Sequence, residues 1–306
     1  MKQSKVIMAL IALISFSVSA QQDAQYTNYM YNTINVNPAY AGSRGSMSIF
    51  GLHRTQWVGI DGAPNTNAFS INTPLSNSKV GFGVSFINES IGVINENKIS
   101  VDLSYTLDLN HNGSKLNFGL KGTANILDVA YSELVQYNPN DPQFQQDIKS
   151  QFTPNFGVGV YWHNKSSYVG LSMPNLLETT RFDNNIQSTM QQKMHYYFMG
   201  GHVFEINPVL KFKPAVLFKA ISGAPLQTDL SANFLMHDKL TLGAAYRFDA
   251  AWSALIGFQV TDGMFVGYSY DAETSKLANY NSGSHEVFLR FELFNKYKRI
   301  HSPRFF

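Results

Sequence analysis

From about residue 45 onward, apolar residues alternate with small or polar residues along most of the chain. The alternation is clearest at residues 80–86, 99–109, 156–160, 240–248 and 287–293. Successive side chains of a β-strand point to opposite faces, so each of these segments has one apolar face and one polar or small face. The pattern therefore predicts an all-β protein.

The alternating segments define 14 expected strands, which is an even number, as in single-chain bacterial membrane barrels. They lie at residues 46–57, 66–73, 79–88, 98–109, 115–128, 153–162, 167–173, 194–205, 209–220, 227–236, 240–249, 252–260, 264–270 and 284–294.

Two architectures have strands with one apolar face: a soluble sandwich and a membrane barrel. Several segments here run roughly 10 to 14 residues, whereas soluble strands are mostly about 5 or 6 residues and tilted membrane strands need roughly 9 to 11. The charged residues also fall on the polar face of their strands, which favours a closed antiparallel transmembrane β-barrel. The charges that we expect to face its lumen are Lys121, Lys211, Lys213, Asp229, Arg247 and Arg290.

The connections between expected strands alternate in length. Those that follow even-numbered strands are short, such as residues 74–78, 110–114 and 163–166, whereas residues 129–152, 174–193 and 271–283 follow odd-numbered strands and are long. Outer-membrane barrels have short periplasmic turns and longer outer loops. We therefore expect both ends of the barrel sequence on the periplasmic side.

Three segments lie outside the expected barrel at residues 46–294. Residues 1–20 have a cationic start, an apolar run of about a dozen residues and small residues before Ala20, which predicts a signal peptide cleaved after Ala20. Residues 21–45 are rich in Tyr, Asn and Gln and lack alternation, so they form either a periplasmic segment or a plug in the lumen. Residues 295–306 form a basic tail, or simply a solvated terminus.

Composition supports export and argues against several functions. Charged and aromatic residues each make up 14% of the chain, whereas charge alone is about 25% of an ordinary soluble domain. The chain has no Cys, so neither disulfides nor thiol chemistry contribute. A net charge of +2 makes nucleic acid a poor partner.

No motif predicts a cofactor, a metal or a catalytic centre. Residues 108–113 fit the opening of a calcium-binding loop, but Gly119 stands where the bidentate acid is needed, and the Asn-Gly pair favours a hairpin turn. The eight His residues form no H-E-x-x-H motif, and we expect a protein that is not an enzyme, with a barrel hydrolase kept as a rival. Aromatic residues near strand ends suit interfacial girdles: Trp57, Trp162, Tyr168, Tyr196, Tyr197, Trp252, Tyr268 and Tyr270.

At the start of the mature chain, a Gln-Tyr-Met segment precedes the block Asn37, Pro38, Ala39, Tyr40, Ala41 and Gly42. In these features the chain resembles the PorP/SprF family of outer-membrane proteins from Bacteroidota. Further on, Arg54, Gln56 and Trp57 match the family's R-x-Q-W, and residues 152–162 are similar to its P-x-x-G-x-G-x-x-Y block. The similarity covers essentially the whole mature chain.

The resemblance implies a role in the type IX secretion system and, in some members, in gliding motility. It implies a secreted cargo protein with a type B C-terminal domain as partner, or periplasmic ring components and a peptidoglycan-binding lipoprotein. We expect cargo to contact the outer loops at residues 129–152 and 174–193, and lipid to contact the barrel wall. The alternative is a diffusion channel for small solutes lined by the lumen charges.

Overall fold

The computed structural model describes residues 27–75, 79–109, 113–134, 146–180 and 191–293. Fourteen of its strands form the wall of a barrel. They are β1 (Met47–Thr55), β2 (Asn65–Pro74), β3 (Val80–Ile91), β4 (Ile94–Asp108), β5 (Lys115–Val129), β6 (Ile148–His163), β7 (Ser167–Met173), β10 (His195–His202), β12 (Leu210–Ile221), β13 (Gln227–Met236), β14 (Leu240–Arg247), β15 (Ala251–Thr261), β16 (Met264–Glu273) and β17 (Ser284–Leu293).

Every neighbouring pair in this wall is antiparallel, and the sheet closes on itself. Strand β1 pairs with β17, and β10 pairs with both β7 and β12. The short strand β11 (Phe204–Asn207) continues beside β12, and β8 (Thr179–Thr180) pairs with β9 (Gln191–Gln192) outside the wall. The predicted fold class and strand number are confirmed.

Two of the predicted long connections are shorter than the sequence pattern indicates. Strand β6 begins at Ile148, not at residue 153, and β16 continues to Glu273, not 270. In both places the alternation breaks down while the backbone pairing continues. The loops predicted at residues 129–152 and 271–283 are therefore longer than the connections in the structure.

Many exposed side chains on the outer face of the wall are apolar, whereas many buried side chains on its inner face are polar, which is the reverse of a soluble protein. On β4, Val101 and Leu103 are 42% and 48% exposed on the outer face, whereas Asp102 between them is fully buried on the inner face. The same alternation recurs on β15, where Trp252 is 57% exposed and Ser253 is buried. An apolar belt of this kind is stable only against lipid.

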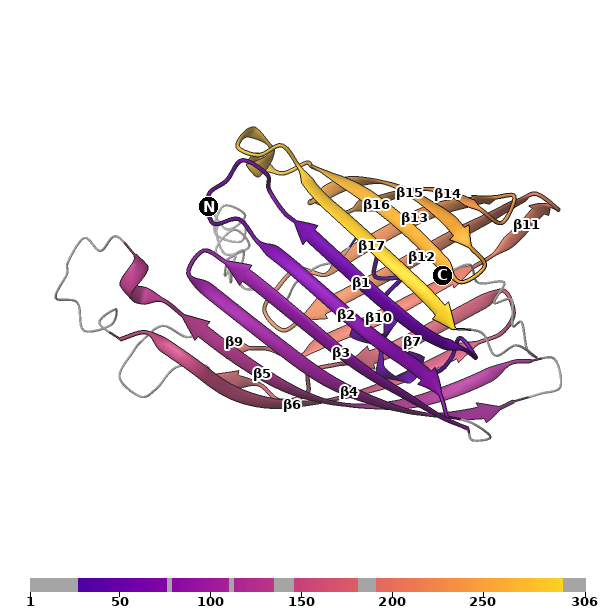
Figure 1. The fold of residues 1–306 in the computed structure, drawn as a ribbon, viewed down its shortest axis with the longest axis horizontal. Coiled ribbons are helices and arrows are strands. Elements are labelled where there is room, and N and C mark those ends of the chain that lie inside the picture. Colours follow the sequence, from indigo (N-terminus) through magenta and orange to yellow (C-terminus); the bar gives the residue numbers. More distant parts are fainter. Residues whose placement is uncertain (1–26, 76–78, 110–112, 135–145, 181–190, 294–306) are drawn as a thin grey trace, which may run out of the picture.

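The two ends of the barrel differ in the length of their connections (Figure 1). Strands β2, β4, β6, β13 and β15 finish at one end of the barrel, which we call the periplasmic end. At the opposite, outer end the hairpin of β5 and β6 projects well beyond the neighbouring strands. The outer end also carries the connections after β1, β7, β12 and β16.

Little of the described chain is helical. The helix α2 (Thr33–Val36) and the 3-10 turn η1 (Pro38–Tyr40) belong to residues 27–45, which we call the plug segment. The turns η2 (Tyr131–Glu133) and η4 (Lys276–Asn279) lie in outer connections. Within the described ranges, no helix is long and apolar enough to cross a membrane. The predicted signal peptide, its cleavage point and the tail at 295–306 lie outside those ranges.

Candidate functional site

The plug segment crosses the lumen from the outer end of the barrel to the periplasmic end. Near its start, the Thr27 hydroxyl donates to Asp271 over 2.6 Å, close to the outer end of β16. Near its finish, Arg44 pairs with Glu292, the penultimate residue of β17 at the periplasmic end. Most of its residues are buried, so the lumen is occupied by the chain's own N-terminal region.

Inward side chains of the wall bind the irregular backbone of the plug segment. The backbone hydrogen bonds within this segment do not use all of its carbonyl groups, and buried carbonyl groups need partners. Donors from three strands supply them. The bonds run from Lys121 to the Ile34 carbonyl (3.3 Å), Ser172 to Val36 (2.8 Å), Asn117 to Ala39 (3.1 Å) and Ser104 to Ala41 (2.7 Å).

The Asn-Pro-Ala-Tyr-Ala-Gly block is the part of the plug segment most closely joined to the wall. Asn37 caps η1 by accepting from the Ala39 backbone N–H over 3.0 Å, and Pro38 suits the first position of that turn. The Asn37 amide also donates to the Val160 and Leu171 carbonyls over 3.0 and 3.3 Å. One side chain thus both starts the turn and ties it to β6 and β7.

Glycines on the inner face of the wall let this block approach the strands. A Cβ atom added at Gly119 would overlap the backbone of Pro38 and Ala39, and one at Gly81 would overlap the Ala41 carbonyl. At Gly159 the Asn37 side chain takes the same space. These inward glycines therefore make the space in which the plug segment contacts the wall.

The substitution Gly119→Ala should loosen the plug segment, because the new methyl group has no room beside Ala39. Overpacking a close contact costs about 1–3 kcal/mol. The temperature at which the barrel loses its heat-modifiable gel mobility should therefore fall. Gly122→Ala on the same strand is the matched control, since nothing lies within 4 Å of its added Cβ. Equal effects of the two substitutions would contradict the close contact between Gly119 and the plug segment.

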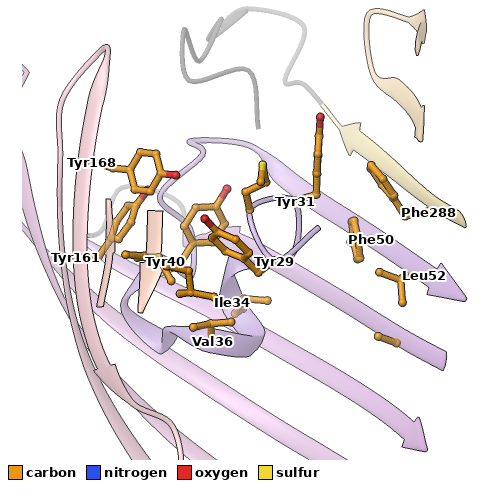
Figure 2. Packing of buried hydrophobic residues seen from close by; sticks show 14 of the residues in the cluster. Tyr29, Tyr31, Ile34, Val36, Tyr40, Phe50, Leu52, Tyr161, Tyr168 and Phe288 are labelled. Atoms are coloured by element: carbon orange, nitrogen blue, oxygen red, sulfur yellow. The ribbon is translucent and has the colours of Figure 1, made fainter. Parts of the chain in front are cut away.

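The centre of the lumen is apolar, which sequence analysis did not anticipate (Figure 2). Tyr29, Tyr31, Ile34 and Val36 of the plug segment pack between residues of opposite parts of the wall. The Tyr31 ring stacks on Phe265 and lies tilted against Phe288, with centroid distances of 5.3 and 4.5 Å. The inward apolar residues of the wall that join this cluster are Phe50, Leu52, Ala68, Tyr161, Tyr168, Met199, Leu217, Leu255, Phe265 and Phe288.

The prediction that Tyr168 and Tyr197 belong to the interfacial girdle is therefore wrong. Tyr168 is 5% exposed and lies on the inner face with Gly170 and Ser172, where its ring is 5.9 Å from Tyr161. Tyr197 also packs against the lumen cluster. Both belong to the interior because the plug segment gives aromatic rings an apolar surface there. Trp252, Tyr196 and Tyr268 are exposed on the outer face.

Arg54 organises a buried ionic cluster at the outer end of the plug segment. Its guanidinium lies 2.7 Å from Asp271 and 3.1 Å from Glu286, and all three side chains are at most 3% exposed. Arg54 also donates to the Thr27 hydroxyl over 3.2 Å, and the Thr27 backbone N–H donates to Glu286 over 3.3 Å. The same charges thus join three strands to the plug segment.

The other residues of the Arg-x-Gln-Trp motif lie in the outer connection after β1. The Gln56 backbone N–H donates to the Pro64 carbonyl over 2.9 Å. Trp57 has a left-handed backbone (φ 48°), and its indole N–H donates to Glu273 over 3.0 Å. Trp57 therefore fastens one outer connection to the end of β16.

Of the six lumen charges singled out in the sequence, five are buried on the inner face and Lys211 is not. Lys121 pairs with Asp102 over 2.9 Å, and Arg247 pairs with Asp229 over 3.1 Å. Lys213 lies 4.9 Å from the Tyr168 ring centroid, and Arg290 lies over Tyr31 and Phe265. Lys211 lies at the periplasmic rim, 2.7 Å from Asp238. Most of these charges therefore contact the wall or the plug segment.

An open cavity lies between the plug segment and the outer connections. We call it the vestibule. Tyr29, Asn35 and Val36 form its floor, and Pro174 and Asn175 border it after β7. Its other lining residues come from the outer halves of wall strands. The vestibule is thus the part of the lumen that the plug segment leaves unfilled.

Two carboxylates join the two sides of the β5–β6 hairpin in the part that the structure describes. Asp147 accepts hydrogen bonds from the Ser132 backbone N–H (2.9 Å) and hydroxyl (3.1 Å), and the backbone bond in particular holds the pKa of Asp147 below its usual value. Asp128 accepts from the Ser150 N–H over 2.7 Å. The hairpin is a defined surface beyond the barrel rim.

Comparison with known sequences gives one family match. The model of a family described as type IX secretion system membrane protein PorP/SprF matches residues 18–291. No curated protein sequence matches the chain significantly.

Solved structures similar to this chain are barrels of low sequence identity. Omp33 of Acinetobacter baumannii is 8% identical, with 81% of this chain and 98% of that chain covered and a TM-score of 0.49. The CymD monoaromatic hydrocarbon channel is 8% identical (86% and 93% covered, TM-score 0.49). A FadL homologue of Pseudomonas aeruginosa is 10% identical (81% and 89% covered, TM-score 0.43).

Proposed function

Because the chain belongs to the PorP/SprF family of type IX secretion system membrane proteins, we propose that it holds or helps to export a secreted cargo protein at the cell surface. The chain itself is an outer-membrane β-barrel. Its proposed role is binding without catalysis. The partner is a cargo protein, and the contact surface is the outer end of the barrel.

The observation that carries this proposal is the occupied lumen. The plug segment is held by carbonyl contacts, ion pairs and an apolar cluster along the whole barrel. A wide pore for solutes needs an open path, whereas an anchoring protein needs a rigid barrel with a surface for its partner. The filled lumen supports the second kind of function over the diffusion channel.

The β5–β6 hairpin supports the location of the contact. It projects beyond the rim at the outer end, and recognition surfaces are commonly loops on a rigid scaffold. The bond from Ser132 to Asp147 joins its two sides near the outermost residues that the structure describes. Pro174 and Asn175, in the connection after β7, border the vestibule. Cargo bound there would lie outside the membrane without entering the lumen.

Replacing residues 130–147 by an Asn-Gly turn should abolish most cargo retention while leaving the barrel folded. The two-residue turn can rejoin β5 and β6 because their ends are already paired at Val129 and Ile148. Retention is measured by pull-down of the tagged protein from intact outer membranes, followed by mass spectrometry. The matched control replaces residues 222–226, a short outer connection, by the same turn. Unchanged retention after the first replacement would refute the proposed contact.

A further inference from the structure

We propose that a groove at the base of the β5–β6 hairpin receives a lysine or arginine side chain of the cargo polypeptide. The groove lies between this hairpin and the turn that joins β3 to β4, and we call it the hairpin groove. The inference rests on the proposed cargo contact and names the chemistry that this contact recognises. Three features carry it: an apolar floor beyond the lipid belt, an excess of carboxylates, and walls that are already joined to each other.

The hairpin groove is an open cavity with room for a long side chain of a partner. Its volume is about 470 Å³, within the range of roughly 300–1,000 Å³ that is common for small-molecule sites. Both sides contribute apolar lining residues, which are Val93 and Ile94 at the start of β4, and Val129, Ala130 and Ile148 in the hairpin. All five are buried or half-buried. The floor of the groove is therefore apolar.

Lipid does not cover this floor, because the lipid belt ends below it. On the outer face of β3, the exposed Phe86 is followed in the same phase by Asn88. The Asn88 amide donates to Asn95 and Asn97 of β4 over 3.0 Å each. A row of carboxamides is costly to place in hydrocarbon. The groove is lined by Asn95 and by residues further out, so it faces water and a polypeptide can reach it.

The charged residues of the hairpin groove are mainly acidic. Asp128, Glu133 and Asp147 line it, and Lys149 is its one cation among the described residues. The ion pairs within the described ranges include none of these three carboxylates. The backbone hydrogen bond from Ser132 lowers the pKa of Asp147, with a smaller contribution from the Lys149 ammonium, so this carboxyl stays ionised. The lining thus has a formal surplus of two negative charges.

The outer end as a whole has the same sign of charge. The described parts of the outer connections contain the acidic residues Asp61, Glu133, Asp147, Glu178 and Asp249, and the basic residues Lys193 and Lys276. A surface with an excess of one sign attracts partners of the opposite sign and speeds their encounter. A basic segment of the cargo therefore matches the outer end in general and the groove in particular.

A lysine or arginine side chain uses the floor and the carboxylates together. Its aliphatic stem packs on apolar surface while its charged head stays near water and acidic groups. A purely apolar side chain would cover the floor but leave the carboxylates unmatched. Within the described ranges, no group of acidic, His or Cys side chains is arranged to hold a metal ion. The occupant that we assign is therefore a basic side chain.

The walls of the groove are joined before a partner arrives. The Ala130 backbone N–H donates to the Val93 carbonyl over 3.0 Å, which links the hairpin to the β3–β4 turn. The Gly92 N–H donates to the Gly62 carbonyl over 2.8 Å, which links that turn to the connection after β1. Binding to walls that are already in place loses less conformational entropy than binding to mobile ones. A single side chain can therefore be recognised there.

The first test is titration of the full detergent-solubilised protein with two dye-labelled blocked peptides, Leu-Arg-Leu and Leu-Gln-Leu, followed by fluorescence anisotropy. The arginine peptide should bind about tenfold or more tightly, because charge-assisted hydrogen bonds are stronger than neutral ones. The double variant Asp128→Asn, Glu133→Gln should weaken its binding by about tenfold or more and leave the glutamine peptide unchanged. Asparagine at 128 can still accept from the Ser150 N–H, so the hairpin is kept.

The matched control is the double variant Glu178→Gln, Asp249→Asn, which removes two acidic residues from other outer connections. It should change the affinity by no more than about twofold, because salt screens distant exposed charges. If Asp128→Asn, Glu133→Gln does not fold, Glu133→Gln alone gives the same comparison. Equal affinity for the two peptides, no binding of the arginine peptide, or binding that the groove variant leaves unchanged would each overturn the proposal. So would calorimetric binding of calcium chloride that the groove variant removes, without binding of the arginine peptide.

Cargo retention in intact outer membranes separates this inference from the proposed function. Retention should fall severalfold in Asp128→Asn, Glu133→Gln and stay unchanged in the matched control. If replacing residues 130–147 abolishes retention but the groove variant does not reduce it, the cargo contact stands and the assigned side chain is wrong. If neither change reduces retention, the contact itself is refuted, and the groove has no role in it.

Discussion

Removing residues 27–45 should convert an electrically silent barrel into one that conducts steadily in a planar bilayer. The hydrogen bonds that close the wall run between strands and do not involve the plug segment. A barrel of this strand number is wider than the 8-stranded barrels that side chains alone can fill, and it approaches the 16–18-stranded porins that contain water. The buried inward charges would then line a hydrated path.

Single-channel recording of the purified protein, with and without residues 27–45, measures this effect. Heat-modifiable gel mobility confirms that the shortened chain still forms a barrel. The variant with residues 130–147 replaced is a second control, because it alters the outer surface and keeps the plug segment, and it should remain silent. Steady conductance of the unaltered protein, equal to that of the shortened one, would show that the plug segment does not block passage and would favour a diffusion channel.

The strands of the wall could be predicted closely from sequence because two independent signals agree there. Lipid requires apolar residues on one face, which imposes period two, and tilted spans fix the length of each alternating run. For β7 and β13 the predicted and observed bounds coincide. Errors occur where the strands extend beyond the membrane, as in β6 from Ile148, because lipid no longer constrains the outer face there.

The interior could be predicted only in part. The sequence indicates inward charges, but the ion pairs depend on which strands are neighbours, and Arg54 meets Asp271 and Glu286 only when β1 closes against β17. The inward apolar residues Phe50 and Phe288 were hidden by the expectation of a watery lumen. Their inward position is explained by a row of rings in which Tyr31 packs against Phe288 and Phe288 packs against Phe50. The Tyr-rich composition of residues 21–45 was the available signal, since large aromatic residues bury well.

The substitution Arg54→Met should lower the free energy of unfolding by about 3–5 kcal/mol, which is more than the cost expected for Gly119→Ala. Removing one partner of a buried ionic group leaves uncompensated charge, and here two carboxylates, Asp271 and Glu286, would remain buried side by side. The bond from Arg54 to Thr27 would also be lost. The outer end of the plug segment should therefore detach first.

Urea unfolding of the detergent-solubilised variants measures this cost, and neutralising the carboxylates tests its cause. The triple variant Arg54→Met, Asp271→Asn, Glu286→Gln should recover most of the lost stability, because no charge is then buried without a partner. Lys211→Met is the matched control, because the Lys211–Asp238 contact is equally short at 2.7 Å but Asp238 is 66% exposed. Exposed pairs contribute about 0–1 kcal/mol. If Arg54→Met costs no more than Lys211→Met, or if the triple variant is no more stable than Arg54→Met alone, buried charge does not hold the plug segment.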